Sequence, residues 1–310
     1  MNVLLHYNAG PALRERLGAL PGLSLRCVAE GDDGALFAAL PDTDVLWHVL
    51  QKCTAQVIAA APRLRLIQKI GVGVNTIDLD AAKARGIAVC NLPGTNSRAV
   101  AEMALLLMLA TLRRLPQFDA GLRAGRWASA PAVQDRLGEL GGRTVGLVGF
   151  GAVPAILAPI LAAMGCRVLY TARTAKPVPY AYRDLDALLG EADIVSLHVP
   201  QTPQTSRMID AGALSRMKPG AILINTARGG LVDEAALVAA LTGGRLAAAG
   251  LDVFDQEPTP ADNPLLQLDN VVVAPHVAWV STGTFDRSFD IAAENVRRLV
   301  AGDALLHRVA

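Results

Sequence analysis

Residues able to bind anions or move protons follow four apolar runs in the second half of the chain. They are His198, Arg228, Asp252, Glu257 and His276. Taken singly, such a residue is most often a solvated charge or a structural histidine. The carboxyl ends of neighbouring parallel strands, however, converge on one ligand site. We therefore predict that these five side chains lie around a common site.

Three of these residues suggest a particular reaction. The planar guanidinium of Arg228 can bind both the carboxylate and the carbonyl oxygen of a 2-oxo acid. His276 can give a proton to that oxygen while a hydride reaches the carbon. Glu257 can orient the imidazole and stabilise its charged form. The set suits hydride transfer coupled to proton transfer.

A glycine-containing segment, Gly71-Val-Gly-Val-Asn75, follows an apolar run directly. The amides of Val72 and Gly73 could bind the substrate carboxylate there. A tight turn that needs glycine for its backbone conformation explains the same residues equally well.

The glycines that a dinucleotide needs lie in Val148-Gly-Phe-Gly-Ala-Val-Pro154. An apolar strand precedes them, and a helix and a second strand, Arg167–Arg173, follow. This is the order of a dinucleotide-binding βαβ unit. Gly149 allows the turn, Gly151 lets pyrophosphate approach, and the amides of Ala152 and Val153 face it. Pro154 replaces the third glycine, and Pro159 is expected to kink the helix or remove a bond.

Cofactor choice depends on the end of the second strand. An NAD-selective site places an acidic residue about 20 residues after the glycines. That position falls at Ala172, and no acidic residue occurs between Gly165 and Asp184. Arg173, Thr174 and Lys176 stand there instead, which favours the 2′-phosphate of NADP. NAD remains possible, and a solvated basic loop is the alternative.

The elements that position these residues are short strands alternating with helices. This pattern predicts an α/β fold with two doubly wound parallel sheets. We expect two α/β domains, and the last segment, Phe285–Ala301, is expected to be an amphipathic helix that returns to the first of them. A long apolar helix, Ser97–Leu115, is expected between domains or subunits, and a polar loop at Gly121–Gly142.

Composition excludes several classes of function. The 310 residues carry 29 basic and 28 acidic side chains, for a net charge of +1, and the charges are dispersed. This gives no stripe for nucleic acid and no patch for a membrane. The longest apolar stretch is too short to span a bilayer. Four cysteines without CxxC spacing favour a reducing, cytoplasmic setting.

The chain resembles the D-isomer-specific 2-hydroxyacid dehydrogenase family over essentially its whole length. The family includes glyoxylate/hydroxypyruvate reductases and phosphoglycerate dehydrogenases. The motifs that carry the resemblance are Gly71-Val-Gly-Val-Asn-Thr-Ile-Asp78, Asn91-Leu-Pro-Gly-Thr-Asn-Ser-Arg-Ala-Val-Ala-Glu102, Val148-Gly-Phe-Gly151, His198-Val-Pro-Gln-Thr-Pro-Gln-Thr205, Asn225-Thr-Ala-Arg-Gly-Gly230, Leu251-Asp-Val-Phe-Asp-Gln-Glu-Pro258 and Ala274-Pro-His-Val-Ala278.

The resemblance implies roles for particular residues. Arg228, Glu257 and His276 would be catalytic, and Val72, Gly73 and Arg228 would bind a small 2-oxo or 2-hydroxy acid. The resemblance also implies a flavodoxin-like substrate-binding domain, residues 1–95 and 281–310, with a Rossmann cofactor domain, residues 96–280, inserted into it. It implies a homodimer as well. Formate dehydrogenase relatives pair glutamine with the histidine, so Glu257 argues against that activity. The positions expected to contact NADP are Gly149, Phe150, Gly151, Ala152, Val153, Arg173, Thr174, Lys176, His198, Val199, Pro200, Thr205, Thr226, Ala227, Asp252, His276 and Ala278.

Other interpretations remain open at this point. A dinucleotide-sensing corepressor shares the fold and site residues. A dehydrogenase of phosphite or of a bulkier 2-oxo acid is a third hypothesis. His48, Leu50 and Trp279 either line the substrate pocket or belong to the core and its rim.

Overall fold

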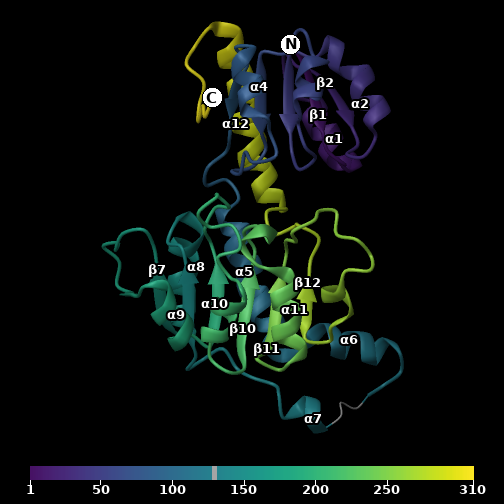
Figure 1. Ribbon diagram of the computed structural model, residues 1–310. Coiled ribbons are helices and arrows are strands. Elements are labelled where there is room, and N and C mark those ends of the chain that lie inside the picture. The colour runs from purple at the N-terminus through teal and green to yellow at the C-terminus, as the bar shows by residue number, and fades with distance from the viewer. Residues whose placement is uncertain (128–130) are drawn as a thin grey trace. The chain divides into compact units, whose positions relative to one another are not determined.

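The computed structural model describes residues 1–127 and 131–310, and its contacts divide the chain into two compact units. Unit 1 comprises residues 1–96 and 280–310, and unit 2 comprises residues 97–279. The chain therefore leaves unit 1, builds all of unit 2, and returns to complete unit 1 (Figure 1).

Unit 1 is built on a five-stranded parallel sheet in the order β2-β1-β3-β4-β5. This is the flavodoxin-like order. The strands are β1 (Asn2–His6), β2 (Ser24–Val28), β3 (Val45–His48), β4 (Leu66–Lys69) and β5 (Ala88–Cys90). The helices are α1 (Pro11–Gly18), α2 (Asp33–Ala39), α3 (Ala55–Ala59), α4 (Leu79–Ala84), α12 (Thr282–Ala301) and the 3₁₀ turn η1 (Leu40–Asp42).

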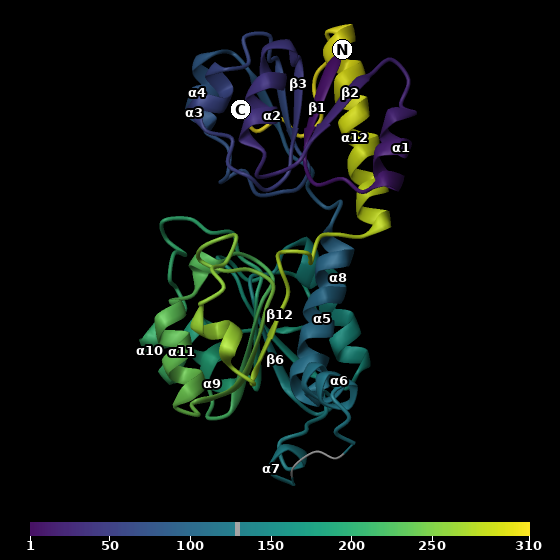
Figure 2. The ribbon, with the colours of Figure 1, turned by 90° about the vertical axis from the view of Figure 1, so that its right-hand side faces the viewer.

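Helix α12 covers the sheet of unit 1 although it comes from the end of the chain. It lies with α1 on one side of that sheet, and α3 and α4 lie on the other (Figure 2). Phe289 of α12 packs against Trp47 of β3, with ring centroids 5.3 Å apart. Asn295 donates a hydrogen bond to Gln68 Oε1 at 2.7 Å. This apolar and polar packing explains why the last helix belongs to the first unit.

Unit 2 holds a seven-stranded, all-parallel sheet in the order β12-β11-β10-β9-β6-β7-β8. The strands are β6 (Thr144–Val148), β7 (Arg167–Thr171), β8 (Ala181–Tyr182), β9 (Ile194–Leu197), β10 (Ala221–Asn225), β11 (Leu246–Leu251) and β12 (Val271–Val273). The strand order reverses between β6 and β9, which is where a doubly wound sheet binds its nucleotide.

Helices cover both faces of this sheet. They are α5 (Ser97–Arg113), α6 (Leu115–Arg123), α7 (Pro131–Gln134), α8 (Ala152–Ala163), α9 (Leu185–Glu191), α10 (Ala211–Arg216), α11 (Glu234–Thr242), η2 (Gly229–Leu231) and η3 (Pro264–Gln267). In Figure 2, α5 and α8 lie on one face, and α9, α10 and α11 lie on the other. The apolar strands are therefore buried on both sides, as an all-parallel sheet requires.

Two details differ from the expectations. The long helix ends at Arg113, because Arg114 adopts a left-handed conformation with φ of 49° and a new helix, α6, begins at Leu115. The segment expected to be a polar loop, 121–142, therefore contains the end of α6 and all of α7, while positions 128–130 lie outside the described residues. Helix α8 continues through Pro159 to Ala163, and because proline has no N–H, one helical hydrogen bond is missing there, as expected.

Candidate active site

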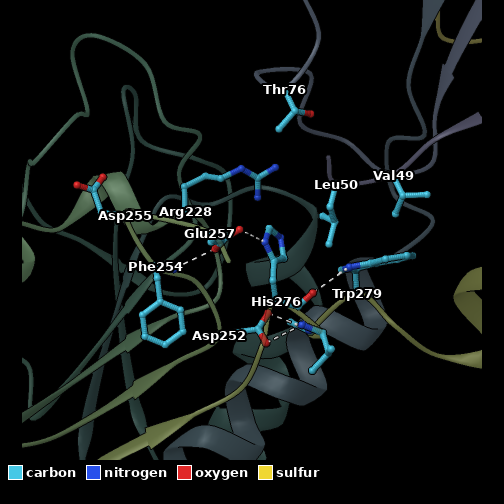
Figure 3. A network of polar contacts seen from close by, with 12 residues as sticks. Val49, Leu50, Thr76, Arg228, Asp252, Phe254, Asp255, Glu257, His276 and Trp279 are labelled. Atoms are coloured by element: carbon cyan, nitrogen blue, oxygen red, sulfur yellow. Dashed lines mark hydrogen bonds and ion pairs between the residues drawn. The ribbon is translucent and has the colours of Figure 1, made fainter. Parts of the chain in front are cut away.

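Glu257 and His276 form a direct pair in unit 2 (Figure 3). Glu257 Oε2 lies 2.6 Å from His276 Nδ1, and its other oxygen accepts the Phe254 amide at 2.9 Å. Burial alone would raise the pKa of Glu257, but the hydrogen bond and charge of His276 outweigh burial and lower it. The carboxylate therefore stays ionised and holds the imidazole by one nitrogen. Among the described residues, Nε2 of His276 has no hydrogen-bond partner.

The backbone of His276 adopts a conformation that few side chains accept. Its φ is 54°, in the left-handed region. Such a conformation typically costs about 1–3 kcal/mol and persists only where the surroundings impose it. Here the amide of His276 donates to Asp252 O at 2.7 Å, and Trp279 Nε1 donates to His276 O at 3.1 Å. The strained turn thus aims the imidazole at its partner.

Asp252 stabilises the same turn through its carboxylate. Its side chain is fully buried, and its two oxygens accept the amides of Val277 and Ala278, each at 2.9 Å. Burial raises the pKa of Asp252, although both amide bonds oppose the shift. Asp252 was predicted to contact the cofactor, and the structure shows that its carboxylate braces the residues following His276.

Arg228 is held in a turn at the end of β10. Asn225 Nδ2 donates to Arg228 O at 2.9 Å, and Asn225 Oδ1 accepts the Ala227 amide at 3.0 Å. The guanidinium is partly buried and donates to Ala227 O at 2.6 Å. Burial lowers the pKa of Arg228 and the charge of Glu257 opposes that shift, yet a guanidinium remains protonated in proteins.

Gly229 lets the Arg228 turn approach the segment that carries Glu257. A Cβ at Gly229 would lie 1.9 Å from Phe254 C and 2.0 Å from Phe254 O, both backbone atoms. No other residue type fits this contact without moving one of the two backbones. Gly229 therefore brings Arg228 and the Glu257 segment side by side, which the sequence motif alone did not reveal.

The glycine turn of the nucleotide fingerprint is built as predicted. Gly149 has a φ of 97°, and a Cβ there would lie 2.7 Å from His198 O. Gly151 caps α8, and a Cβ there would meet nothing within 4 Å, so the approach to the helix N-terminus is open. Pro154 lies in the first turn of α8, where a proline removes no helical bond.

Three features test whether a dinucleotide fits this site. The buried hydroxyl of Thr226, at the end of β10, has no hydrogen-bond partner within the described part of the chain. Unsatisfied buried hydroxyls are rare, and a ligand group is one explanation. The exposed side chains of Arg173 and Lys176 form no ion pair with any described residue. Together with the open N-terminus of α8, these features match an anionic dinucleotide.

The other predicted cofactor positions lie at the same edge of the sheet, and their side chains differ in polarity and in the contacts they make. His198 contacts Ser196 Oγ at 2.9 Å, and desolvation lowers its pKa to about 4, so the imidazole is neutral. Thr205 uses its hydroxyl within its own loop, donating to Pro200 O at 2.7 Å and accepting the Thr202 amide at 2.8 Å. Phe150, Val199, Ala227 and Ala278 line the same strand ends without polar side chains.

The predicted carboxylate-binding loop belongs to unit 1. Val72 is exposed, and within the described chain no acceptor pairs with the amides of Val72 and Gly73. Asn91 Nδ2 donates to Val72 O at 2.9 Å, which fixes the loop. Lys69 Nζ donates to Val49 O and, at 3.3 Å, to Thr76 Oγ1, so a buried cation lies next to this loop.

His48 and Leu50, which were considered as lining of a substrate pocket, make hydrogen bonds within unit 1. His48 is buried in unit 1 and its Nε2 lies 2.6 Å from Gln51 O. Burial lowers the pKa of His48 well below its ordinary value, so the ring is neutral. Leu50 is partly buried, and its amide donates to Glu30 Oε1 at 2.8 Å. His48 is therefore a core residue, whereas Leu50 retains exposed surface.

The fold agrees with the comparison to known proteins. The family profile described as "D-isomer specific 2-hydroxyacid dehydrogenase, NAD binding domain" matches residues 105–278. The chain belongs to the D-isomer-specific 2-hydroxyacid dehydrogenase family.

Three similar proteins illustrate the range of the family. D-3-phosphoglycerate dehydrogenase of Mycobacterium bovis is 42% identical over 97% of this chain and 57% of its own length. The chain thus spans little more than half of that relative. Glyoxylate reductase of Korarchaeum cryptofilum is 42% identical over 84% of this chain and 81% of its own length. The solved NADPH-dependent glyoxylate/hydroxypyruvate reductase of Sinorhizobium meliloti, in complex with NADP and malonate, is 34% identical, covers 100% and 96% of the two chains, and has a TM-score of 0.84.

The described part of the chain contains no helix that could cross a membrane and no cluster of residues suited to holding a metal ion.

Proposed function

We propose that the protein is an NAD(P)-dependent oxidoreductase that reduces a small 2-oxo acid, of the glyoxylate or hydroxypyruvate type, to the D-2-hydroxy acid. The observation that carries the proposal is the 2.6 Å contact between Glu257 Oε2 and His276 Nδ1. It leaves Nε2 of an oriented imidazole as the proton donor. Family membership supports the same reaction class.

The residues of this chain divide the work as follows. Arg228 binds the substrate carboxylate and carbonyl through its guanidinium, and the amides of Val72 and Gly73 bind the carboxylate. His276 gives its Nε2 proton to the carbonyl oxygen, and Glu257 stabilises the imidazolium before that transfer. When bound, the nicotinamide supplies the hydride. Gly149, Gly151 and the N-terminus of α8 would hold its pyrophosphate.

The preferred cofactor in this proposal is NADPH. Arg173 and Lys176 present positive charge after β7 that no carboxylate of the described residues neutralises by an ion pair, and Ala172 stands where an NAD-selective site has an acidic residue. A hydrogen bond to a charged group contributes about 1.5–3 kcal/mol. Arg173→Ala should therefore weaken NADPH binding by roughly 10–150-fold and leave NADH binding nearly unchanged. Fluorescence titration with both cofactors measures this, and equal weakening of both contradicts the phosphate contact.

The substrate is tested by a panel assayed with both cofactors. Glyoxylate, hydroxypyruvate and pyruvate are compared as oxidants of NADPH and NADH, and 3-phosphoglycerate is assayed in the oxidative direction. We expect the highest kcat/KM for glyoxylate or hydroxypyruvate with NADPH. Turnover confined to 3-phosphoglycerate would overturn the substrate assignment and keep the reaction class. Tight cofactor binding without any turnover would favour a dinucleotide-sensing protein instead.

The proposal includes a homodimer in the cytoplasm. Unit 2 exposes Leu115 and Leu122 on α6 and Trp127 just beyond it, and Trp127 is 89% exposed. Such apolar surface favours association. All four cysteines are free thiols, which suits a reducing compartment. Light scattering of wild type and Leu122→Glu tests the dimer, and a monomeric wild type at micromolar concentration contradicts it.

A further inference from the structure

Tyr170 has a buried hydroxyl that bonds twice to one residue of the neighbouring loop. The residue lies near the end of β7, and 1% of its surface is exposed. Its hydroxyl accepts the amide of Lys176 at 2.7 Å and donates to the carbonyl of Lys176 at 3.1 Å. One side chain thus satisfies both backbone groups of a residue six positions away, and closes the loop 171–176.

The ring of Tyr170 joins this loop to the glycine turn. Its centroid lies 4.8 Å from that of Phe150, which stands between the two glycines of the fingerprint. The Tyr170 ring also packs edge-on against Tyr182, with centroids 5.6 Å apart. The hydroxyl of Tyr182 donates to Ala172 O at 3.3 Å and holds the start of the loop. Tyr170 is therefore packed between the two segments expected to receive phosphates.

The loop that Tyr170 closes carries the basic side chains discussed above. Arg173, Thr174 and Lys176 are exposed, and no carboxylate within the described residues pairs with them. Their side chains are free to move, so their usefulness to a phosphate depends on how well the backbone beneath them is fixed. Fixing a loop in its binding conformation before the ligand arrives raises affinity, because less conformational entropy is lost on binding.

We propose that Tyr170 is a positioning residue of the 2′-phosphate site: its hydroxyl fixes the Lys176 backbone and presents the basic loop to the phosphate of NADPH. The inference rests on the proposed preference for NADPH and goes beyond it by naming the group that builds the site. Tyr170 does not touch the phosphate and acts through Lys176.

The test uses two probes that differ only in the phosphate concerned. Adenosine 2′,5′-bisphosphate and 5′-AMP are titrated calorimetrically into wild type, Tyr170→Phe and Tyr180→Phe. Tyr170→Phe removes the hydroxyl and keeps the ring. Tyr180→Phe is the matched control, because Tyr180 packs against Phe150 with centroids 5.8 Å apart while its hydroxyl has no hydrogen bond to any described residue.

We expect Tyr170→Phe to raise the Kd of the bisphosphate by about 2- to 12-fold, the usual range for one net hydrogen bond. The Kd of 5′-AMP should stay unchanged, and Tyr180→Phe should alter neither value. In a Lys176→Ala background the effect of Tyr170→Phe should fall below about twofold, because the two residues act on one contact. A general loss of structure would weaken both probes equally.

Two failures are distinguishable. A wild type that binds the bisphosphate no tighter than 5′-AMP overturns the proposed NADPH preference itself. A wild type that prefers the bisphosphate, with Tyr170→Phe indistinguishable from it, overturns only the role of Tyr170.

Amide hydrogen exchange of the wild-type protein gives a check that needs no variant. The Lys176 amide should exchange slowly for an exposed loop, and exchange at the unprotected rate contradicts the inference.

Discussion

Replacing Gly229 by alanine should damage both stability and catalysis, because the added methyl group has no room. The new Cβ would lie 1.9 Å from Phe254 C, 2.0 Å from its carbonyl oxygen and 2.3 Å from the amide nitrogen of Asp255. All three are backbone atoms, so no side-chain rotation relieves the overlap. Overpacking of this kind costs about 1–3 kcal/mol and occasionally more, and we place Gly229→Ala at the upper end, about 3 kcal/mol.

The consequence for unfolding follows from the size of unit 2, residues 97–279. For 150–250 residues, 1 kcal/mol shifts the Tm by about 2–4 °C, so a decrease of roughly 6–12 °C is expected by calorimetry. Arg228 precedes Gly229 directly, and the opposing backbone leads to Glu257. Displacing a catalytic group by about 1 Å can cost 10²-fold in rate. The kcat/KM should therefore fall by about that factor well below the Tm.

Gly190→Ala is the matched control for this prediction. Gly190 lies in α9 of the same unit, and the nearest atom to its added Cβ is Arg216 O at 4.0 Å. Alanine is favoured over glycine in a helix, so this variant should have an equal or higher Tm and an unchanged kcat/KM. If Gly229→Ala behaved like Gly190→Ala, the close approach of the two backbones, and the account of how Arg228 is positioned, would be wrong.

Three further outcomes test individual side chains. Arg228→Lys should lower kcat/KM by at least about tenfold in steady-state kinetics, because an ammonium cannot make two parallel bonds to a carboxylate; near wild-type values would make Arg228 structural. The lowered pKa of Glu257 keeps this carboxylate charged at neutral pH, and its charge favours the imidazolium that reduction consumes. Glu257→Gln should therefore move the alkaline fall of the pH–rate profile to lower pH. An unmoved profile contradicts the pairing. Thr226→Val should raise the Tm of the cofactor-free protein, because it removes a buried hydroxyl that no described residue satisfies. The same variant should weaken cofactor binding. An unchanged Kd of the cofactor would show that the hydroxyl does not face it.

Local patterns in the sequence predicted much of this architecture. The apolar runs noted before the glycine turn and before the four groups of polar residues coincide with β6, β9, β10, β11 and β12, and the predicted strand Arg167–Arg173 contains β7. The glycine turn at Gly149 was predicted because its chemistry is local. Helix α6 was missed, because the continuous apolar pattern of α5 concealed the break at Arg114, whose left-handed conformation no local signal required.

The contacts that build the site were beyond such patterns. Asp252 ended an apolar strand and was predicted to face the cofactor, but no pattern indicated that its oxygens accept amides 25 and 26 residues later in the chain. The packing of Gly229 against Phe254 likewise joins residues from different loops. Tyr170 lies within the second predicted strand, and only the fold shows its hydroxyl at the Lys176 backbone. Each is a tertiary contact that no spacing rule encodes.

The central claim is that His276, oriented by Glu257, gives a proton to the oxygen of a small 2-oxo acid. The most direct measurement is the rate of NADPH oxidation with glyoxylate and hydroxypyruvate by wild type and His276→Ala, with the NADPH Kd of each determined separately. The account predicts a fall in kcat of about 10²–10⁴-fold with the cofactor Kd changed by less than about threefold. A variant that retains wild-type kcat, or one that loses cofactor binding in proportion to activity, would contradict it.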